Sequence, residues 1–316
     1  MENFVEELRA AIEKSTSKCK AITIALSGGL DSSILAYYLK DKNAKAIAVT
    51  SKDFIATDLT YCQLVAKQFN LPLKIIMPTI EELLNSINET IKILKNFNDI
   101  EIRNSIIMYL ILKTAKEEGD LKIISGDGAD ELFAGYSFFL KKNNIELQND
   151  LLRIWNIMHF PSKKIGDALG ITVETPFLDD DVIDLAKKIP ANFKVNEFKG
   201  KKYGKWILRK AYEEKLPKNI VWREKSPMQD GAGTAALTHL FETVIPDEVF
   251  EKKTKQIEKS DNVKLRTKES LHYYEVYRKY NEPPEKLHSS KNKCPYCRYE
   301  IKQGSKFCRM CGSFPI

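Results

Sequence analysis

Residues 27–33, with the sequence SGGLDSS, set the architecture that we expect of this chain. The apolar run AITIAL precedes them at 21–26, and ILAYYL, which opens a helical pattern, follows at 34–39. A strand, a glycine turn and a helix N-terminus form a phosphate site, because backbone N–H groups turn inward and the helix end adds positive partial charge. A carboxylate beside phosphates usually holds a metal ion, which suits Asp31. An ordinary glycine turn, in which Asp31 or Ser32 caps the helix, is the alternative.

The same stretch resembles the PP-loop of the ATP pyrophosphatases, enzymes that split ATP between its α and β phosphates. It lacks the GK[ST] ending of a P-loop, so transfer of the γ phosphate is the less favoured chemistry. The resemblance implies that this stretch holds the pyrophosphate part of ATP.

Apolar runs alternate with helical patterns through the first half of the chain. After the strand at 21–26, further strands are expected at 45–50, 73–77 and 122–125, and helices at 2–17, 57–69 and within 80–116. Such alternation predicts an α/β fold with a doubly wound parallel sheet, whose ligands bind at the carboxyl ends of the strands. From about residue 136 the pattern is mainly helical, apart from a short apolar interruption at 171–177. Helices are expected there at 146–158, 179–188, 203–215, 233–245 and 264–280.

The composition is that of a soluble globular protein, with 43% hydrophobic and 29% charged residues among 316. No apolar run reaches membrane-spanning length, and the amphipathic start MENFVEELRAAIEKS is not a signal peptide, so we expect a cytoplasmic protein without a membrane partner. The formal net charge of +7 suits ATP, an acidic substrate or RNA.

A second polar loop, SGDGADELFAGY at 125–136, follows the fourth expected strand. Asp127, Asp130 and Glu131 crowd three carboxylates into five residues, which is costly unless a cation shares the site. A solvated acidic loop that caps the next helix is the alternative. With the first loop on the same sheet edge, magnesium on the phosphates of ATP is the better partner.

Four motifs in order are similar to the synthetase domain of the asparagine synthetase family, which includes β-lactam synthetase. They are the stretch at 27–33, FNDIEIRNSIIMYLILKTAKEEGDLKIISGDGADELFAGYSFF at 97–139, TPFLDDDVIDLAKKIP at 175–190 and KWILRKAYEEKLPKNIVWREKSPMQDGAG at 205–233. The resemblance covers about residues 21–233. It implies a PP-loop fold, also called adenine nucleotide alpha hydrolase-like, with ATP and Mg²⁺ as cofactors.

The resemblance also assigns roles to single residues. It implies that Asp31 and Asp130 bind magnesium, and that pyrophosphate is held by Ser27, Gly28, Gly29 and Ser32. The backbone at the strand ends would hold adenine, with the candidates Leu26, Thr50 and Gly126. Lys205 and Lys225 match the family lysines that contact the phosphates and the developing charge, and Arg103 matches an arginine beside the active site. For most lysines of the basic stretch 199–225, a solvated helix face is the plainer explanation.

The acceptor side of the site departs from the family. Asp127, a candidate proton acceptor, stands where asparagine synthetase has a glutamate, and Glu174 stands where it has an arginine. The segment between Tyr136 and Pro176 is shorter, so the resemblance does not extend to aspartate as the acceptor. The chain starts about twenty residues before the first strand, without the glutaminase and its cysteine. We therefore expect free ammonia, an amine or a separate glutaminase partner to supply nitrogen.

Four cysteines form two CxxC pairs near the end of the chain, Cys294, Cys297, Cys308 and Cys311. Thiolates at this spacing can close tetrahedrally on one structural Zn²⁺ ion, as in a zinc ribbon. A redox pair, disulfides and an iron–sulfur cluster are the alternatives. The Pro-, Ser- and Lys-rich segment 281–293 reads as a linker, so we expect a PP-loop domain at 1–283 and a linker with a zinc ribbon at 284–316. The ribbon would recruit a protein, and its basic side chains are also compatible with RNA.

The sequence as a whole favours an ATP-dependent, AMP-forming ligase. It would adenylate a carboxylate or a similar oxygen of a small-molecule acceptor and let ammonia or an amine displace AMP. A PP-loop enzyme that modifies tRNA with nitrogen or sulfur is the first alternative, with the ribbon gripping RNA. A non-catalytic nucleotide-binding adaptor is the second.

Overall fold

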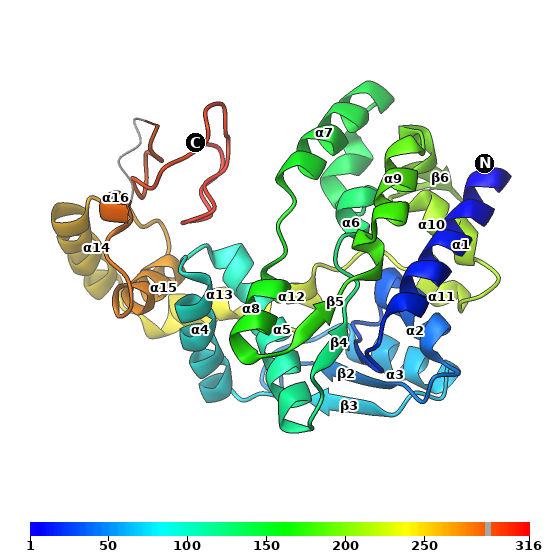
Figure 1. Cartoon of the computed structure of the whole chain (residues 1–316). Coiled ribbons are helices and arrows are strands. Elements are labelled where there is room, and N and C mark those ends of the chain that lie inside the picture. Colours follow the sequence, from blue (N-terminus) through cyan, green and yellow to red (C-terminus); the bar gives the residue numbers. More distant parts are fainter. Residues whose placement is uncertain (288–291) are drawn as a thin grey trace.

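A computed structural model describes residues 1–287 and 292–316 (Figure 1). Its centre is a parallel sheet in the order β3-β2-β1-β4-β5, formed by Thr23–Ala25 (β1), Lys45–Val49 (β2), Leu73–Ile76 (β3), Lys122–Ile124 (β4) and Thr172–Glu174 (β5). The chain winds outward from β1 in both directions, so the order reverses between β1 and β4. This confirms the predicted doubly wound sheet and puts its switch point beside residues 27–33. The apolar interruption expected at 171–177 contains the edge strand β5.

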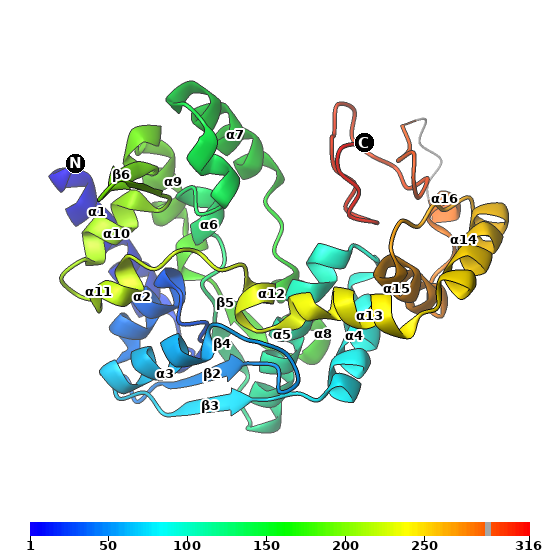
Figure 2. The ribbon, with the colours of Figure 1, turned by 180° about the vertical axis from the view of Figure 1, so that it is seen from behind.

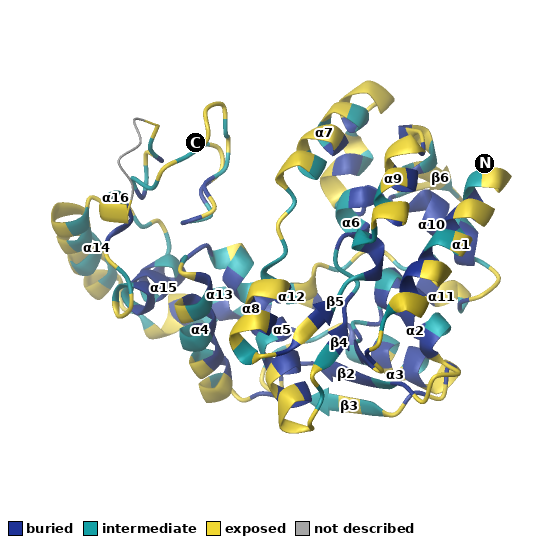
Figure 3. Cartoon of the chain, in the orientation of Figure 1, coloured by how far each residue is buried: buried dark blue, intermediate teal, exposed yellow. Residues whose placement is uncertain are grey.

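The inner strands of the sheet are buried on both faces, and their alternate residues point into different cores. In β2, Ala46 and Ala48 pack on one side, whereas Ile47 and Val49 pack on the other. The first face is covered by helices that include Glu2–Lys18 (α1), Leu30–Leu39 (α2) and Leu59–Gln68 (α3). The second face is covered by helices that include Ile80–Leu94 (α4), Asp99–Glu117 (α5) and Pro161–Leu169 (α8). Figure 3 shows β2 mostly dark, whereas the edge strand β3 is teal and yellow, because its residues are intermediate or exposed.

The second half of the chain is mainly helical, as predicted. Its further helices are Ala129–Leu132 (α6), Asn144–Ile157 (α7), Asp180–Lys188 (α9), Trp206–Tyr212 (α10), Lys218–Val221 (α11), Met228–Gly231 (α12), Leu237–Val244 (α13), Asp247–Asp261 (α14), Lys268–Arg278 (α15) and Pro284–Leu287 (α16). Short 3₁₀ helices lie at Ser137–Lys141, Pro176–Leu178, Ala191–Phe193 and Thr234–Ala236. An antiparallel hairpin joins Asn196–Phe198 (β6) to Lys201–Tyr203 (β7).

Several boundaries differ from the prediction for local reasons. The helix expected at 203–215 begins only at Trp206, because 201–203 pairs in the hairpin and Lys205 has a left-handed φ of 54°. The helical region 80–116 breaks at Lys95, which is also left-handed, and restarts where the Asn98 side chain caps α5. Helix α14 was not predicted, since none of its residues is buried and its sequence, DEVFEKKTKQIEKSD, contains few apolar residues.

The C-terminal segment 292–316 lies beside α15 and the start of α5 in both ribbon views (Figures 1 and 2). Phe97 N–H donates to the Met310 carbonyl over 2.9 Å, and Lys264 N–H donates to the Tyr296 carbonyl over 2.7 Å. The predicted linker 281–293 lies partly outside the described residues, and the division of the chain at 283/284 stays a prediction. Among the described residues, no helix combines the length and apolarity that a membrane crossing needs.

Candidate active site

The turn at 27–33 joins the carboxyl end of β1 to α2, as the sequence predicts. Gly28 has a φ of +65°, and a Cβ there would lie 2.6 Å from the backbone N of Cys62, so only glycine fits. Gly29 is the N-cap of α2. The Ser27 and Ser32 hydroxyls are 3.1 Å apart, and Ser27 N–H donates to the Ser32 hydroxyl over 3.2 Å. The turn is therefore held by its own serines, with the start of α2 behind it.

Two acidic and two basic side chains from four segments meet beside this turn. Lys205 Nζ forms ion pairs with Asp31 and with Asp130, the latter at 2.7 Å. Lys225 pairs with the other oxygen of Asp130. The Lys205 side chain is only 6% exposed, whereas that of Lys225 is 28% exposed. The structure thus brings together both predicted magnesium ligands and both predicted lysines.

The charges within this cluster shift one another's pKa values. Burial alone would raise the pKa of Asp130, but Lys205 and Lys225 outweigh it and hold that pKa low. Burial raises the pKa of Asp31, and the negative charge of Asp130 adds to the rise. For Lys205, burial favours a lower pKa, yet the two carboxylates raise it. Asp130 and Lys205 are therefore both charged at neutral pH.

A divalent cation suits the donors of this cluster. Asp31 Oδ1 is buried and lacks a hydrogen-bond donor among the described residues. Asp31 and Asp130 offer only carboxylate oxygens, which are the ligands that Mg²⁺ prefers. Lys205 lies between them and supplies the compensating charge. The donor set therefore fits magnesium on the phosphates of a nucleotide.

The backbone candidates for adenine lie along the same sheet edge. Leu26 N–H donates to Ile47 O and Thr50 N–H donates to Ile76 O, so both residues extend the strands past their carboxyl ends. At Gly126, a Cβ would lie 3.2 Å from the Cβ of Asp31. The loop after β4 therefore touches the turn after β1, as the sequence predicts.

Asp127 lies apart from the ion-pair cluster. Its carboxylate accepts a hydrogen bond from the Ser162 hydroxyl in α8, and its N–H donates to Ser125. Burial raises the pKa of Asp127, against the opposing effect of the bonds from Ser162 and Ser125. A carboxylate with a raised pKa in a partly buried site can accept a proton from an incoming amine.

Arg103 has a different set of partners. Its Nη1 pairs with the Glu269 carboxylate of α15 at 2.9 Å, and its Nε donates to Gln229 in α12 over 3.0 Å. The Thr238 hydroxyl shares the same Glu269 oxygen at 2.8 Å. None of these partners belongs to the Asp31–Asp130 cluster. The bonds of Arg103 to described residues therefore tie α5 to α12 and α15 and do not involve the Asp31–Asp130 cluster.

Glu174, the charge reversal noted in the sequence, also has structural partners. Its carboxylate accepts hydrogen bonds of 2.9 Å from the N–H groups of Lys20 and Ala21. These bonds anchor the segment that enters β1.

Sequence reasoning missed a strap formed by residues 222–233, which crosses the carboxyl edge of β2 (Figure 2). Arg223 in this strap pairs with Asp58, donates to Gly28 O over 3.3 Å, and stacks on Tyr61 at 3.8 Å from the ring centroid. Ser51 N–H donates to Ala232 O over 2.8 Å. The strap thereby holds Lys225 beside the turn at 27–33. In the sequence, the basic residues of the stretch 199–225 were the only signal of this strap.

The four C-terminal cysteines form one cluster, as predicted. Their sulfur atoms all lie within 4.8 Å of one another, with 3.8 Å between Cys294 and Cys311 and 3.6 Å between Cys297 and Cys308. All four are free thiols at a separation far beyond a disulfide bond. This geometry is compatible with one tetrahedral metal ion such as zinc.

Comparisons with known proteins show which proteins this chain resembles. A family model described as asparagine synthase matches residues 3–164 and 147–288. The nodule asparagine synthetase [glutamine-hydrolyzing] of Pisum sativum is 32% identical over 250 residues, which are 72% of this chain and 42% of that protein. Asparagine synthetase B [glutamine-hydrolyzing] of Escherichia coli is 30% identical over 259 residues, 75% of this chain and 46% of the relative. The chain thus spans less than half the length of these curated relatives.

A solved structure, NMN synthetase from Francisella tularensis, aligns with 92% of this chain and 98% of its own chain. Its sequence identity is 14% and the TM-score is 0.37, which is too low to support a structural argument.

Proposed function

Because this chain belongs to the asparagine synthase family, we propose that it is an ATP-dependent ligase that releases AMP and pyrophosphate. The observation that supports this most is the partly buried cluster of Asp31, Asp130, Lys205 and Lys225 at the glycine turn. A phosphate-binding turn, two carboxylates for a divalent cation and two preplaced ammonium groups are the parts that adenylyl transfer needs.

In this proposal, Asp31 and Asp130 hold magnesium, and the residues at 27–33 hold pyrophosphate. Magnesium, when bound, would neutralise phosphate charge. Lys205 is nearly buried between the two carboxylates, so its ammonium contributes already to the binding of ATP. Leu26, Thr50 and Gly126 would face adenine through their backbone atoms.

Lys225 has a different role in the proposal. It is more exposed than Lys205, and its Nζ lies 5.0 Å from the centroid of the Tyr136 ring. An acceptor oxygen that attacks the α phosphorus places new charge on the phosphate oxygens. A preplaced ammonium gains most from that charge in the transition state, so Lys225 would accelerate the reaction more than it tightens ATP binding.

The acceptor side is proposed to work through Asp127. With a raised pKa and a hydrogen bond from Ser162, its carboxylate would take the proton of ammonia or an amine that displaces AMP from the activated carboxylate or similar oxygen. Arg103 would act as a positioning residue, because it holds Gln229 in the strap that carries Lys225. The cysteine cluster would bind one structural zinc ion, since four thiolates leave no open coordination position.

The products of ATP test this function. With magnesium, ATP and a panel of small carboxylates, amines and total tRNA, we expect AMP and pyrophosphate. Asp31→Asn should abolish their formation, because it removes a metal ligand. Lys225→Ala should bind ATP almost normally but turn over slower by a factor on the order of 100 to 1,000. Formation of ADP and phosphate, or wild-type turnover in Asp31→Asn, would overturn the proposal.

A further inference from the structure

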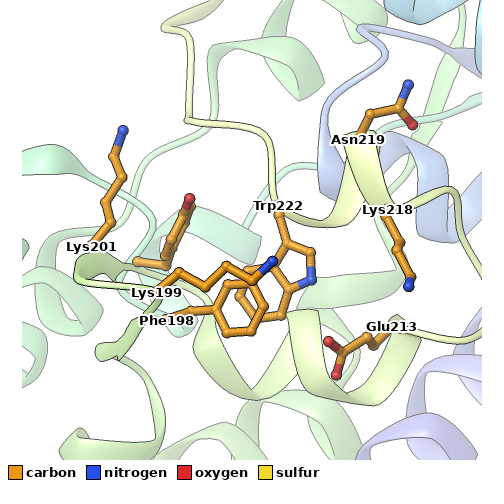
Figure 4. A pocket seen from close by; sticks show the side chains of 8 residues that line it. Phe198, Lys199, Lys201, Glu213, Lys218, Asn219 and Trp222 are labelled. Carbon is orange, nitrogen blue, oxygen red and sulfur yellow. The ribbon is translucent and has the colours of Figure 1, made fainter.

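An aromatic hollow of about 460 Å³ lies between the β6–β7 hairpin and α11 (Figure 4). At its base the rings of Phe198 and Trp222 stack with centroids 4.0 Å apart and an angle of 16° between planes. Tyr203 meets Trp222 edge-on at 5.4 Å, and Trp206 supports it from the buried side at 5.5 Å. Such a partly exposed group of rings offers a rigid surface on which another flat ring can stack.

The rim of the hollow is mainly basic, with Lys199, Lys201 and Lys218, and its one acidic side chain among the described residues, Glu213, pairs with Lys210 at 2.6 Å. Lys199 crosses in front of the Phe198–Trp222 pair, and Lys218 lies on the other side of Trp222 (Figure 4). Lys199 Nζ is 5.4 Å from the centroid of the Phe198 ring. Within the described residues, neither Lys199 nor Lys218 has a carboxylate at salt-bridge distance, whereas Lys201 pairs with Glu224. Two ammonium groups beside the rings are therefore available to an anionic ligand.

The hollow continues toward the candidate active site. A second hollow of about 600 Å³ shares Tyr203, Lys218 and Trp222 with the first and extends to Arg223 and Lys225. Arg223 in turn contacts Gly28 of the glycine turn, and Lys225 pairs with Asp130. The two hollows thus adjoin at these shared residues, and we refer to them together as the groove between the hairpin tip and Lys225.

We propose that this groove binds single-stranded RNA and brings one of its nucleotides to Lys225. Stacking rings recessed between unpaired cations are the pattern by which proteins hold single-stranded nucleic acid, because bases stack on the rings and phosphates meet the cations. A groove of two connected hollows suits successive nucleotides. RNA binding in the groove does not depend on the proposed function. Only the further step, in which ATP activates the nucleotide beside Lys225 as the acceptor, rests on it.

Fluorescence anisotropy with a labelled oligouridylate, over a series of salt concentrations, tests the groove. Lys199→Ala/Lys218→Ala should weaken binding by roughly 10-fold and flatten the slope of log K against log salt by about 1.4, the contribution of two phosphate contacts. Phe198→Ala should weaken binding by about 5-fold or more with little change in slope, because it removes stacking. The matched control is Lys252→Ala/Lys259→Ala on the exposed helix α14, which loses the same charge and should bind like the wild type.

Two binding results would overturn the proposal. If Lys252→Ala/Lys259→Ala weakened binding as much as Lys199→Ala/Lys218→Ala, RNA would be held by the general positive charge of the protein. Uridine 5′-monophosphate could compete as well as the oligonucleotide, which would indicate a site for a small anion. If Phe198→Ala fails to fold, Trp222→Phe replaces it as the test of stacking, because it keeps an aromatic ring in the core. We expect Trp222→Phe to weaken RNA binding, since the smaller ring stacks less well.

Assays of ATP separate this inference from the proposed function. Pyrophosphate release that depends on a small carboxylate, with no RNA binding, would contradict the groove and leave the ligase intact. RNA binding that is lost in the groove variants, with no cleavage of ATP under any condition, would support the groove and contradict the ligase. Lys199→Ala/Lys218→Ala should keep wild-type affinity for magnesium–ATP, since neither lysine belongs to the ATP cluster.

Discussion

Lys205 reaches the two carboxylates through a backbone conformation that lysine rarely adopts. Its φ is 54°, and its N–H donates to Phe133 O over 2.9 Å. A Cβ on Gly204 would lie 2.1 Å from Ala134 O, and a Cβ on Gly135 would lie 1.8 Å from Asp130 Oδ1. The strained lysine costs on the order of 1 kcal/mol or more, and the glycines let two segments approach closely enough to place its ammonium.

Lys194 is a second buried lysine, and it has no ionic partner in the described part of the chain. Its Nζ has no hydrogen-bond partner and lies 4.4 Å from the centroid of the Trp155 ring. Burial lowers its pKa to about 7. Because the unfolded chain has an ordinary lysine pKa, it binds more protons than the native state between about pH 7 and pH 10. Native stability should therefore rise with pH across that window through this residue.

We predict that Lys194→Met raises the free energy of unfolding near pH 7 by about 2–4 kcal/mol, because no ammonium has to be buried. The gain should shrink as the pH approaches 10, where the unfolded lysine also loses its proton. Urea denaturation at several pH values measures both effects. Lys188→Met, at an exposed lysine of α9, is the control and should change little. A destabilised Lys194→Met, or a gain that is the same at every pH, would contradict the prediction.

At the scale of elements, the strap at 222–233 and the loop at 51–58 are hydrogen-bonded to each other beside the carboxyl edge of the sheet. Thr57 and Asp58 both donate their N–H groups to Gly231 O over 3.1 Å. The side chains of Asp58 and Arg223 are each only 10% exposed where they pair. Removing one partner of such a buried pair typically costs about 3–5 kcal/mol, so this pair holds the strap in place.

We predict that Asp58→Asn loosens the strap. Trypsin should then cut after Arg223 and Lys225 faster than in the wild type, and magnesium–ATP should bind more weakly because Arg223 no longer supports Gly28. Mass spectrometry of the fragments and calorimetric titration of ATP measure the two effects. Asp230→Asn alters an exposed carboxylate of the same strap and should behave like the wild type. Equal rates of trypsin cleavage in Asp58→Asn and Asp230→Asn would contradict the prediction that the Asp58–Arg223 pair holds the strap in place.

At the scale of the whole molecule, the cysteine cluster shares a core with the helices of the larger part of the chain. Cys294, Cys297 and Cys308 are buried in the same apolar cluster as residues of α4, α5 and α15. Phe97, which precedes α5, meets Tyr274 at 4.9 Å and Tyr277 at 5.3 Å between ring centroids. Asn98, the cap of α5, lies so close to Gly312 that a Cβ there would be 2.7 Å from its Oδ1. The packing connects the cysteine cluster to the helix that carries Arg103.

We predict that removing the metal destabilises more than the C-terminal segment. A chelator should lower the melting temperature measured by near-ultraviolet circular dichroism, because loss of the segment exposes Phe97 and the tyrosines of α15. Elemental analysis should find one zinc per chain, absent in Cys308→Ser. Cys19→Ser, at a cysteine outside the cluster, should retain zinc and the wild-type melting temperature. Iron in place of zinc, or an unchanged melting temperature after chelation, would contradict this prediction.

The sequence by itself determined the sheet and the glycine turn at residues 27–33. Apolar runs of strand length and the glycines of residues 27–33 are local signals, and local sterics and burial act on them within a few residues. The CxxC pairs likewise predicted a cluster that the structure confirms, because their spacing alone brings the thiols together.

The family resemblance implied that Asp31, Asp130, Lys205 and Lys225 share one site, but the tertiary structure alone decided the contacts through which these distant segments meet. Lys205 and Asp31 are 174 positions apart, and Arg223 and Gly28 are 195 apart. No local pattern encodes such pairs, since they depend on left-handed residues and close glycine contacts that sequence periodicity does not carry. The hollow at Phe198 and Trp222 also depends on tertiary structure, because an unpredicted hairpin brings Phe198 against Trp222. From the sequence alone, a solvated helix face explains most lysines of 199–225.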